Sequence, residues 1–225
     1  MSAPVDTVLF DIDDTLCAYR RSGADVLTAA FEATGVEPFF GIEDYYDRYS
    51  AFVDRTDTIH ELRTACFAAL ADERGRDPDH GRAVAAAYAD ERDHRAVDAL
   101  PGAREAVDRL GADHRLGVVT NGAPGMQAEK LAAIGLDDAF EVVVHAGYDA
   151  PAKPDPAPFH HALDALDTDP DSTVHVGNSL TSDVPGAQAA GLRAAWLADG
   201  STPDPVPAYT LDSMTALHEP PWQTR

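Results

Sequence analysis

A short acidic segment near the start of the chain holds side chains that could perform phosphoryl chemistry. Asp11-Ile12-Asp13-Asp14-Thr15 directly follows residues 5–10, a short β-prone run that predicts a β-strand. A carboxylate such as Asp11 can attack a phosphoryl group and form an aspartyl-phosphate. Asp13 is placed to protonate the leaving oxygen and then to activate water. In a chain this rich in aspartate the cluster is weak evidence by itself, so the case depends on other segments.

Further polar residues follow predicted strands or lie in loops between predicted elements. Thr120 and Asn121 end a strand predicted at 115–120, Lys153 precedes a helix predicted at 156–166, and Asn178 and Asp183 follow a strand predicted at 173–177. Ligands of an open parallel sheet bind beyond the carboxyl ends of its strands, so we expect these loops to converge. The Thr120 hydroxyl and the Lys153 ammonium would then bind phosphoryl oxygens.

The same set of oxygen-bearing residues predicts a magnesium site. Mg²⁺ prefers oxygen ligands and usually takes a small number of carboxylates. Asp11, the backbone carbonyl of Asp13, and Asp183 could provide them. The cation would offset charge on the phosphoryl oxygens, so Mg²⁺ is the expected cofactor.

The order of these segments resembles the four motifs of the haloacid dehalogenase superfamily. The matching segments are residues 11–15, Thr120-Asn121-Gly122, Lys153-Pro154-Asp155-Pro156, and residues 176–183. The resemblance implies a Rossmann-like core with a helical C1-type cap and the activity of the phosphatase branch. It implies these roles: Asp11 as nucleophile, Asp13 as acid and base, Thr120, Asn121 and Lys153 as phosphate-binding residues, and Asp183 as a metal ligand.

Two positions depart from the family's pattern. Asn178 stands where many members carry aspartate, and Asp14 where glycine is frequent. An amide oxygen can ligate a metal or position a metal-bound water, but it brings no charge. We therefore place Asn178 in the metal shell, with its share of the ligation relative to Asp183 open, and expect Asp14 to face solvent.

The predicted elements indicate an α/β fold interrupted by a helical insertion. From about residue 98, helices alternate with strands at 115–120, 140–145, 173–177 and 193–197, and a possible edge strand lies at 209–211. This alternation is typical of a parallel sheet with right-handed crossovers. We expect a Rossmann-like core of residues 1–16 and 98–225 with about five strands.

The segment between the first two core strands has helical periodicity and no convincing strand. Residues 42–53 and 59–70 carry apolar side chains at helical spacing, and an earlier and a later helix are predicted around residues 27–34 and 79–88. Residues 17–97 are therefore predicted to form a helical cap. Its regularly spaced aromatic residues, Tyr45, Tyr46, Tyr49 and Phe52, are expected in the core of that cap.

The composition is strongly acidic. The net charge is −22, aspartate greatly outnumbers glutamate, and arginine provides nearly all the positive charge because Lys130 and Lys153 are the only lysines. This balance favours a halophilic protein adapted to molar salt, with an acidic mesophilic protein as the alternative. A surface of this charge repels nucleic-acid polymers, whereas small anions can still bind where local cations neutralise them. A small phosphorylated metabolite is the partner that the resemblance implies.

Other features of the sequence predict a cytoplasmic protein without membrane contact. No stretch is apolar enough for a membrane span, and residues 1–6 do not have the pattern of a signal peptide. Cys17 and Cys66 match no disulfide framework or metal spacing and are predicted to be packing residues. Lys130, in a predicted helix, is expected on a solvated face.

The sequence leaves several alternatives to a phosphatase open. A 2-haloacid dehalogenase resembles this chain but lacks an acid at the position of Asp13, because a halide leaving group needs no proton. A phosphomutase has no sequence feature in its favour. A receiver-like signalling domain would carry its phosphorylated aspartate on a later strand. A phosphate-binding protein without turnover draws support only from Asn178. A calcium loop of the EF-hand type does not fit Thr15 and Leu16, and zinc hydrolysis is unsupported because no His-Glu-x-x-His motif appears.

Overall fold

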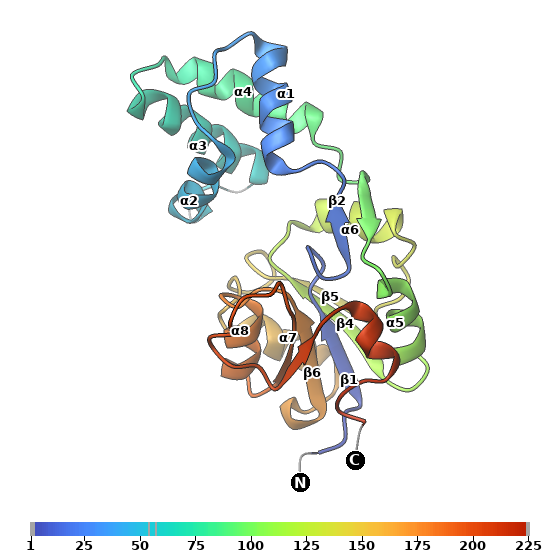
Figure 1. The fold of residues 1–225 in the computed structure, drawn as a ribbon. Coiled ribbons are helices and arrows are strands. Elements are labelled where there is room, and N and C mark those ends of the chain that lie inside the picture. Colours follow the sequence, from blue (N-terminus) through green and yellow to red (C-terminus); the bar gives the residue numbers. More distant parts are fainter. Residues whose placement is uncertain (1–2, 54, 57, 224–225) are drawn as a thin grey trace. The chain divides into compact units, whose positions relative to one another are not determined.

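The computed structural model describes residues 3–53, 55–56 and 58–223 of the chain, which fold into two compact units (Figure 1). Unit 1 contains Met1–Tyr19 and His94–Arg225, and unit 2 contains Arg20–Asp93. No helix in the described ranges combines the length and the apolar character that a membrane span requires.

Unit 1 is built on a six-stranded sheet whose neighbouring strands are all parallel. In spatial order the strands are β5 (Val142–His145), β4 (Arg115–Thr120), β1 (Thr7–Phe10), β6 (Thr173–Gly177), β7 (Arg193–Leu197) and β8 (Tyr209–Leu211). The α/β fold is thus confirmed, and the possible strand at the C-terminal edge is present. The register places Phe10 opposite Val118 of β4 and Val176 of β6. Asp11 therefore leaves the sheet level with Gly177, where β6 ends, and one residue before the end of β4 at Thr120.

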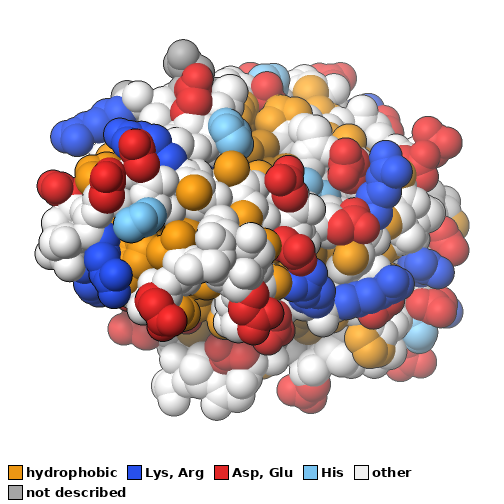
Figure 2. All heavy atoms as spheres, turned by 90° about the horizontal axis from the view of Figure 1, so that it is seen from above, with side chains coloured by type: hydrophobic (Ala, Val, Ile, Leu, Met, Phe, Trp, Pro, Cys, Tyr) orange, Lys and Arg blue, Asp and Glu red, His pale blue; other side chains and the backbone are white. Residues whose placement is uncertain are grey.

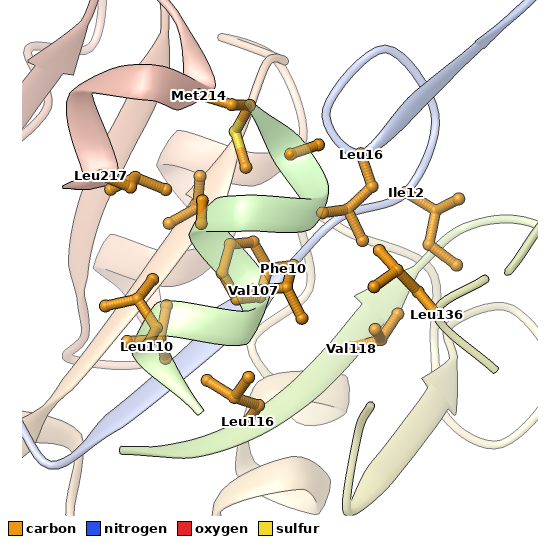
Figure 3. Packing of buried hydrophobic residues seen from close by; sticks show 14 of the residues in the cluster. Phe10, Ile12, Leu16, Val107, Leu110, Leu116, Val118, Leu136, Met214 and Leu217 are labelled. Atoms are coloured by element: carbon orange, nitrogen blue, oxygen red, sulfur yellow. The ribbon is translucent and has the colours of Figure 1, made fainter. Parts of the chain in front are cut away.

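Helices cover both faces of this sheet. They are α5 (Ala103–Leu110), α6 (Pro124–Ala133), α7 (Ala157–Leu166) and α8 (Asp183–Ala189), with short 3₁₀ helices at Pro170–Ser172 and Met214–His218. On one face, Phe10 and Val118 pack with Val107 of α5 and Met214 (Figure 3). On the other, Leu9 and Val119 pack with residues of α7 and α8. Because side chains of a strand alternate between faces, a continuous apolar run such as Val8–Phe10 is buried on both sides.

A two-stranded antiparallel ribbon corrects the prediction that no strand follows β1 before residue 98. It pairs β2 (Cys17–Tyr19) with β3 (Val97–Ala99), and Cys17 lies opposite Ala99. Each strand has only three residues, which is too short for an alternating pattern to be recognisable. Pairing between residues so distant in sequence is decided by the tertiary fold.

Unit 2 is helical, as predicted for this part of the chain. It contains α1 (Gly23–Thr34), α2 (Ile42–Val53), α3 (Ile59–Glu73) and α4 (Pro78–Glu91). Its core includes Tyr45, Phe67 and Tyr88, whose rings meet edge to face or tilted. Tyr46 contradicts the prediction that it belongs to this core, since it is 48% exposed. Val53 was also part of the apolar periodicity predicted over residues 42–53, and its side chain lies outside the described residues.

Candidate active site

The Lys153 ammonium joins two of the predicted carboxylates at the carboxyl edge of the sheet. Its Nζ lies 2.9 Å from Asp11 Oδ1 and 2.6 Å from Asp183 Oδ1, and it also donates to the carbonyl of Val119 at 2.7 Å. Asp11 follows β1, Asp183 begins α8, and Lys153 comes from the loop before α7. Three separate loops therefore meet at one cation, and all three side chains are buried.

Burial and charge act differently on the two carboxyl groups. Burial raises the pKa of Asp11 to about 7; Lys153 opposes this rise, and the nearby Asp183 and Asp13 carboxylates add to it. Burial would also raise the pKa of Asp183, but Lys153 and a hydrogen bond from His175 outweigh it and hold that pKa well below its usual value. Asp183 is thus the securely ionised member of the pair, and Asp11 gains most from an additional cation.

Asp183 is held in place by His175, which sequence reasoning missed, and by the backbone of Ser179, within the motif. His175 Nε2 lies 3.1 Å from Asp183 Oδ1, and the Ser179 backbone N–H donates to Oδ2 at 3.0 Å. Gly177 makes room for this carboxyl group, because a Cβ at position 177 would lie 2.4 Å from Asp183 Cγ. His175 is the middle residue of β6 and was indistinguishable in sequence from an ordinary strand residue.

Lys130 corrects the prediction of a solvated helix residue. It is 1% exposed, and its Nζ donates to Asp13 Oδ1 at 2.5 Å while lying 4.7 Å from the centre of the Tyr19 ring. Burial lowers the pKa of Lys130, but the Asp13 carboxylate and Tyr19 more than compensate, so the pKa is raised and the group stays charged. Both lysines of the chain therefore lie in this site.

Gln127, another residue that sequence reasoning missed, contacts two of the predicted site residues. It is fully buried on α6, and its Nε2 donates to Asp13 Oδ2 at 2.8 Å and to Thr120 Oγ1 at 2.9 Å. Thr120 Oγ1 also accepts from the Gly122 backbone N–H at 3.2 Å. Gln127 and Lys130 are three residues apart and so share a face of the helix that follows Thr120, but this spacing alone does not show that the face is turned toward Asp13.

Both polar atoms of the Asn121 side chain make hydrogen bonds to the backbone of Lys153. Its side-chain amide accepts from the Lys153 backbone N–H at 2.8 Å and donates to the Lys153 carbonyl at 3.1 Å. Asn121 therefore fixes the loop that carries Lys153, and its contact with phosphate stays a prediction. Asp14 is exposed, as expected, and has φ of 55°.

Asn178 lies at the same edge of the sheet and is half-buried. Its Oδ1 accepts from the Thr15 hydroxyl at 3.4 Å, and its backbone carbonyl accepts from Trp196 Nε1 at 2.8 Å. The first bond ties the loop after β6 to the acidic segment, and the second ties it to β7. The amide oxygen is the atom through which Asn178 would approach a metal or its bound water.

The residues at this edge fit a hard divalent cation. Among the described residues, no three His, Cys, Asp or Glu side chains form a ready metal cluster. Yet Asp11 and Asp183 lie within reach of one ammonium, and Lys130 and Gln127 occupy both carboxylate oxygens of Asp13. The backbone carbonyl oxygen is therefore the atom of Asp13 that would bind the metal ion. Three carboxylates face two ammonium groups, so the site lacks positive charge for a phosphate dianion.

Comparisons with known proteins agree with this architecture. Residues 5–191 match the model of the haloacid dehalogenase-like hydrolases. The chain is 30% identical to a phosphoserine phosphatase of Thermus thermophilus, over 88% of this chain and 90% of that protein. It is 37% identical to a glyceraldehyde 3-phosphate phosphatase of Pyrococcus abyssi, over 45% of this chain and only 43% of that relative.

The fold also resembles a solved structure along nearly its whole length. The putative HAD-hydrolase YfnB of Bacillus subtilis, crystallised bound to magnesium, superimposes with a TM-score of 0.78 at 25% identity, covering 96% of this chain and 98% of that one. The family match spans far more than half of the sequence. This chain therefore belongs to the haloacid dehalogenase-like hydrolase family.

Proposed function

We propose that this protein is a phosphatase that hydrolyses a small phosphorylated metabolite through an aspartyl-phosphate. One observation carries the proposal: Asp11 shares the Lys153 ammonium with Asp183, while Asp13 is held nearby by a separate set of donors. A nucleophile, a cation for phosphoryl oxygens, and a second carboxyl group for proton transfer are the groups that such a reaction needs.

The proposed reaction has two halves. Asp11 attacks phosphorus, a bond forms between its carboxylate oxygen and phosphorus, and the bond to the leaving oxygen breaks as that oxygen takes a proton from Asp13. A water molecule then attacks the phosphorus and gives its proton to Asp13, and the bond from phosphorus to Asp11 breaks. Inorganic phosphate leaves, and both carboxyl groups return to their starting states.

Asp11, the Asp13 carbonyl, Asp183 and Asn178 would hold Mg²⁺ in the working enzyme. When bound, the cation would neutralise charge on the phosphoryl oxygens. Lys153 orients Asp11 and adds a second positive charge, and Thr120 donates its hydroxyl proton to a phosphoryl oxygen. Unit 2 is proposed to act as the cap that excludes water and selects the leaving group.

The nucleophile is tested by a matched pair of aspartate variants. Asp11→Asn should abolish hydrolysis of p-nitrophenyl phosphate in molar KCl with Mg²⁺, because an amide cannot form the acyl phosphate. Asp14→Asn makes the same change of charge three residues away on an exposed side chain and should retain activity within about twofold. Turnover that survives in Asp11→Asn would remove Asp11 from the proposed role.

Three further measurements separate the alternatives. Release of chloride from 2-chloropropionate by the wild-type protein, without phosphatase activity, would favour a dehalogenase. Binding of inorganic phosphate without turnover would favour a non-catalytic phosphate-binding protein. A phosphoryl group that stays on Asp11 for minutes after acetyl phosphate treatment would favour a receiver-like domain.

The names of the relatives suggest where to search for a substrate. The two relatives above are named for phosphoserine and for glyceraldehyde 3-phosphate, both small phosphorylated metabolites. A panel of phosphomonoesters that contains these two compounds, assayed by phosphate release, is therefore the first screen. A preference for one of them by more than tenfold in kcat/KM would identify the substrate class.

A further inference from the structure

We propose that Gln127 and Lys130 of α6 form a positioning pair that orients the Asp13 carboxylate toward the leaving oxygen and the Thr120 hydroxyl toward the phosphoryl oxygens. The inference rests on the phosphatase function proposed above and concerns residues outside the four motifs. It begins from the two buried polar side chains that reach Asp13 from one face of α6, three residues apart.

Each oxygen of Asp13 has its own buried donor. Lys130 Nζ binds Oδ1 at 2.5 Å and Gln127 Nε2 binds Oδ2 at 2.8 Å. Two donors on two oxygens fix the plane of the carboxyl group, although the Asp13 side chain is 43% exposed. A half-exposed aspartate without such partners would sample several rotamers, and proton transfer requires a defined geometry.

Gln127 also determines what the Thr120 hydroxyl can do. A hydroxyl group has two acceptor sites and one proton to donate. Thr120 Oγ1 accepts from Gln127 Nε2 at 2.9 Å and from the Gly122 N–H at 3.2 Å. Because both acceptor sites are filled by protein donors, the hydroxyl proton is left to donate to an incoming phosphoryl oxygen.

The position of Gln127 depends on a neighbouring glycine, and it leaves one buried oxygen atom without a hydrogen-bond partner in the part of the chain that the structure describes. A Cβ at Gly122 would lie 1.8 Å from Gln127 Nε2, so the amide reaches Thr120 only because residue 122 is glycine. Gln127 Oε1 is buried and has no hydrogen-bond partner among the described residues. A buried acceptor without a partner lowers stability, which is unexpected for a residue that serves the fold alone.

Lys130 is equally unusual for this chain. Arginine supplies the positive charge everywhere except at Lys130 and Lys153, and both lysines are buried at the site. A compact ammonium fits between the Asp13 carboxylate and the Tyr19 ring, 4.7 Å away, where a planar guanidinium would need more room. The Tyr19 hydroxyl in turn meets His94 Nδ1 at 2.7 Å, which fixes the ring that covers Lys130.

The role of Lys130 is tested by varying the leaving group. Phenol, like tyrosine, has a pKa of about 10 and needs a proton as it leaves, whereas p-nitrophenol leaves more readily without one. Lys130→Met should lower kcat for phenyl phosphate by roughly 30-fold and kcat for p-nitrophenyl phosphate by less than about threefold. The first loss is smaller than the roughly 100-fold or more that general acid catalysis contributes, because the acid is still present and only its orientation is lost. Glu129→Gln, a change of charge on the exposed residue that precedes Lys130, should leave both values unchanged.

A double-mutant cycle asks whether Lys130 acts through Asp13. In an Asp13→Asn background, Lys130→Met should cause no further selective loss on phenyl phosphate, because the group that it orients is already gone. If Lys130→Met lowers kcat by the same factor for both substrates, in either background, the residue serves only the fold and the inference is wrong. If the wild-type protein hydrolyses neither compound, the proposed function fails and the positioning role fails with it.

Gln127→Met provides a second and different readout. The variant keeps the volume but removes the donor to Thr120, so the inhibition constant of inorganic phosphate should rise about fivefold or more. Lys130→Met should leave that constant within about twofold. Because the unpartnered Oε1 is also removed, the melting temperature of Gln127→Met should be equal to or above that of the wild type. Unchanged phosphate inhibition, or weaker inhibition explained by a lower melting temperature, would overturn the role of Gln127.

Discussion

At the scale of single residues, burial decides whether the two cysteine thiols can react. Cys17 and Cys66 are both buried, which confirms the prediction that they are packing residues. Burial raises the pKa of the Cys17 thiol to about 12 and that of the Cys66 thiol to about 11; the Asp13 carboxylate adds to the first shift. The thiolate is the reactive form, so both thiols are poor nucleophiles near neutral pH.

This environment predicts slow thiol modification with a distinctive pH dependence. In the native protein at pH 8, a disulfide reagent such as DTNB should modify neither cysteine within minutes, and both should react after unfolding in guanidinium. Because the raised pKa moves the formation of thiolate to higher pH, the slow native rate should keep rising through pH 9.5, where an ordinary thiol reaches its plateau. Rapid modification of one thiol at pH 8 would show that its pocket opens to solvent.

At the scale of elements, the turn from β6 into α8 is the most restricted part of the site. This turn carries Gly177, Asn178 and Ser179 and ends at the buried Asp183. The Ser179 N–H and His175 both bind the Asp183 carboxylate, so the backbone and the strand together orient one side chain. The close approach of this carboxylate to the Gly177 backbone leaves no room for a side chain there.

Gly177→Ala should therefore damage both stability and magnesium binding. The new Cβ would lie 2.4 Å from Asp183 Cγ, and such overpacking costs about 1–3 kcal/mol in urea unfolding. Displacement of Asp183 should also weaken Mg²⁺ binding in calorimetry. Gly125→Ala is the matched control, since a Cβ there meets nothing within 4 Å on α6. A Gly177→Ala protein with wild-type stability and affinity would contradict this account of the turn.

At the scale of the whole molecule, the charge is the dominant feature. The net charge is −22, and the acidic side chains are spread across the face that Figure 2 shows, with arginines among them. The exposed ion pairs all use arginine in the part of the chain that the structure describes, as between Arg48 and Glu73 or Arg115 and Glu141. Each exposed pair contributes at most about 1 kcal/mol, so the excess negative charge determines the response to salt.

Stability should therefore rise with salt. Between 0.1 M and 1 M KCl the Debye length falls from about 10 Å to about 3 Å, which screens the repulsion among the acidic groups. We expect the melting temperature to increase by about 5 °C or more over this range, and to increase similarly in choline chloride, because screening does not depend on the cation. A melting temperature that stays constant or falls would show that the arginine pairs matter more than the net charge.

The sequence by itself determined the fold class and the placement of the principal site residues. The strands at 115–120, 173–177 and 193–197 were predicted at their observed bounds, because buried parallel strands are mostly apolar runs between clear turn residues. In a parallel sheet the ends of such strands meet at one edge, so Asp11, Lys153 and Asp183 could be expected together before any coordinate was known.

Only the tertiary structure decided which polar residues serve the site from outside the motifs. Gln127 and Lys130 on α6 and His175 within β6 have ordinary positions in their elements, and their burial follows from contacts across 114, 117 and 8 residues of chain. Local periodicity carries no information on such partners. For Lys130 a compositional clue existed, since the chain avoids lysine elsewhere, but only the packing of α6 against Asp13 and Tyr19 shows that its ammonium is buried in the site.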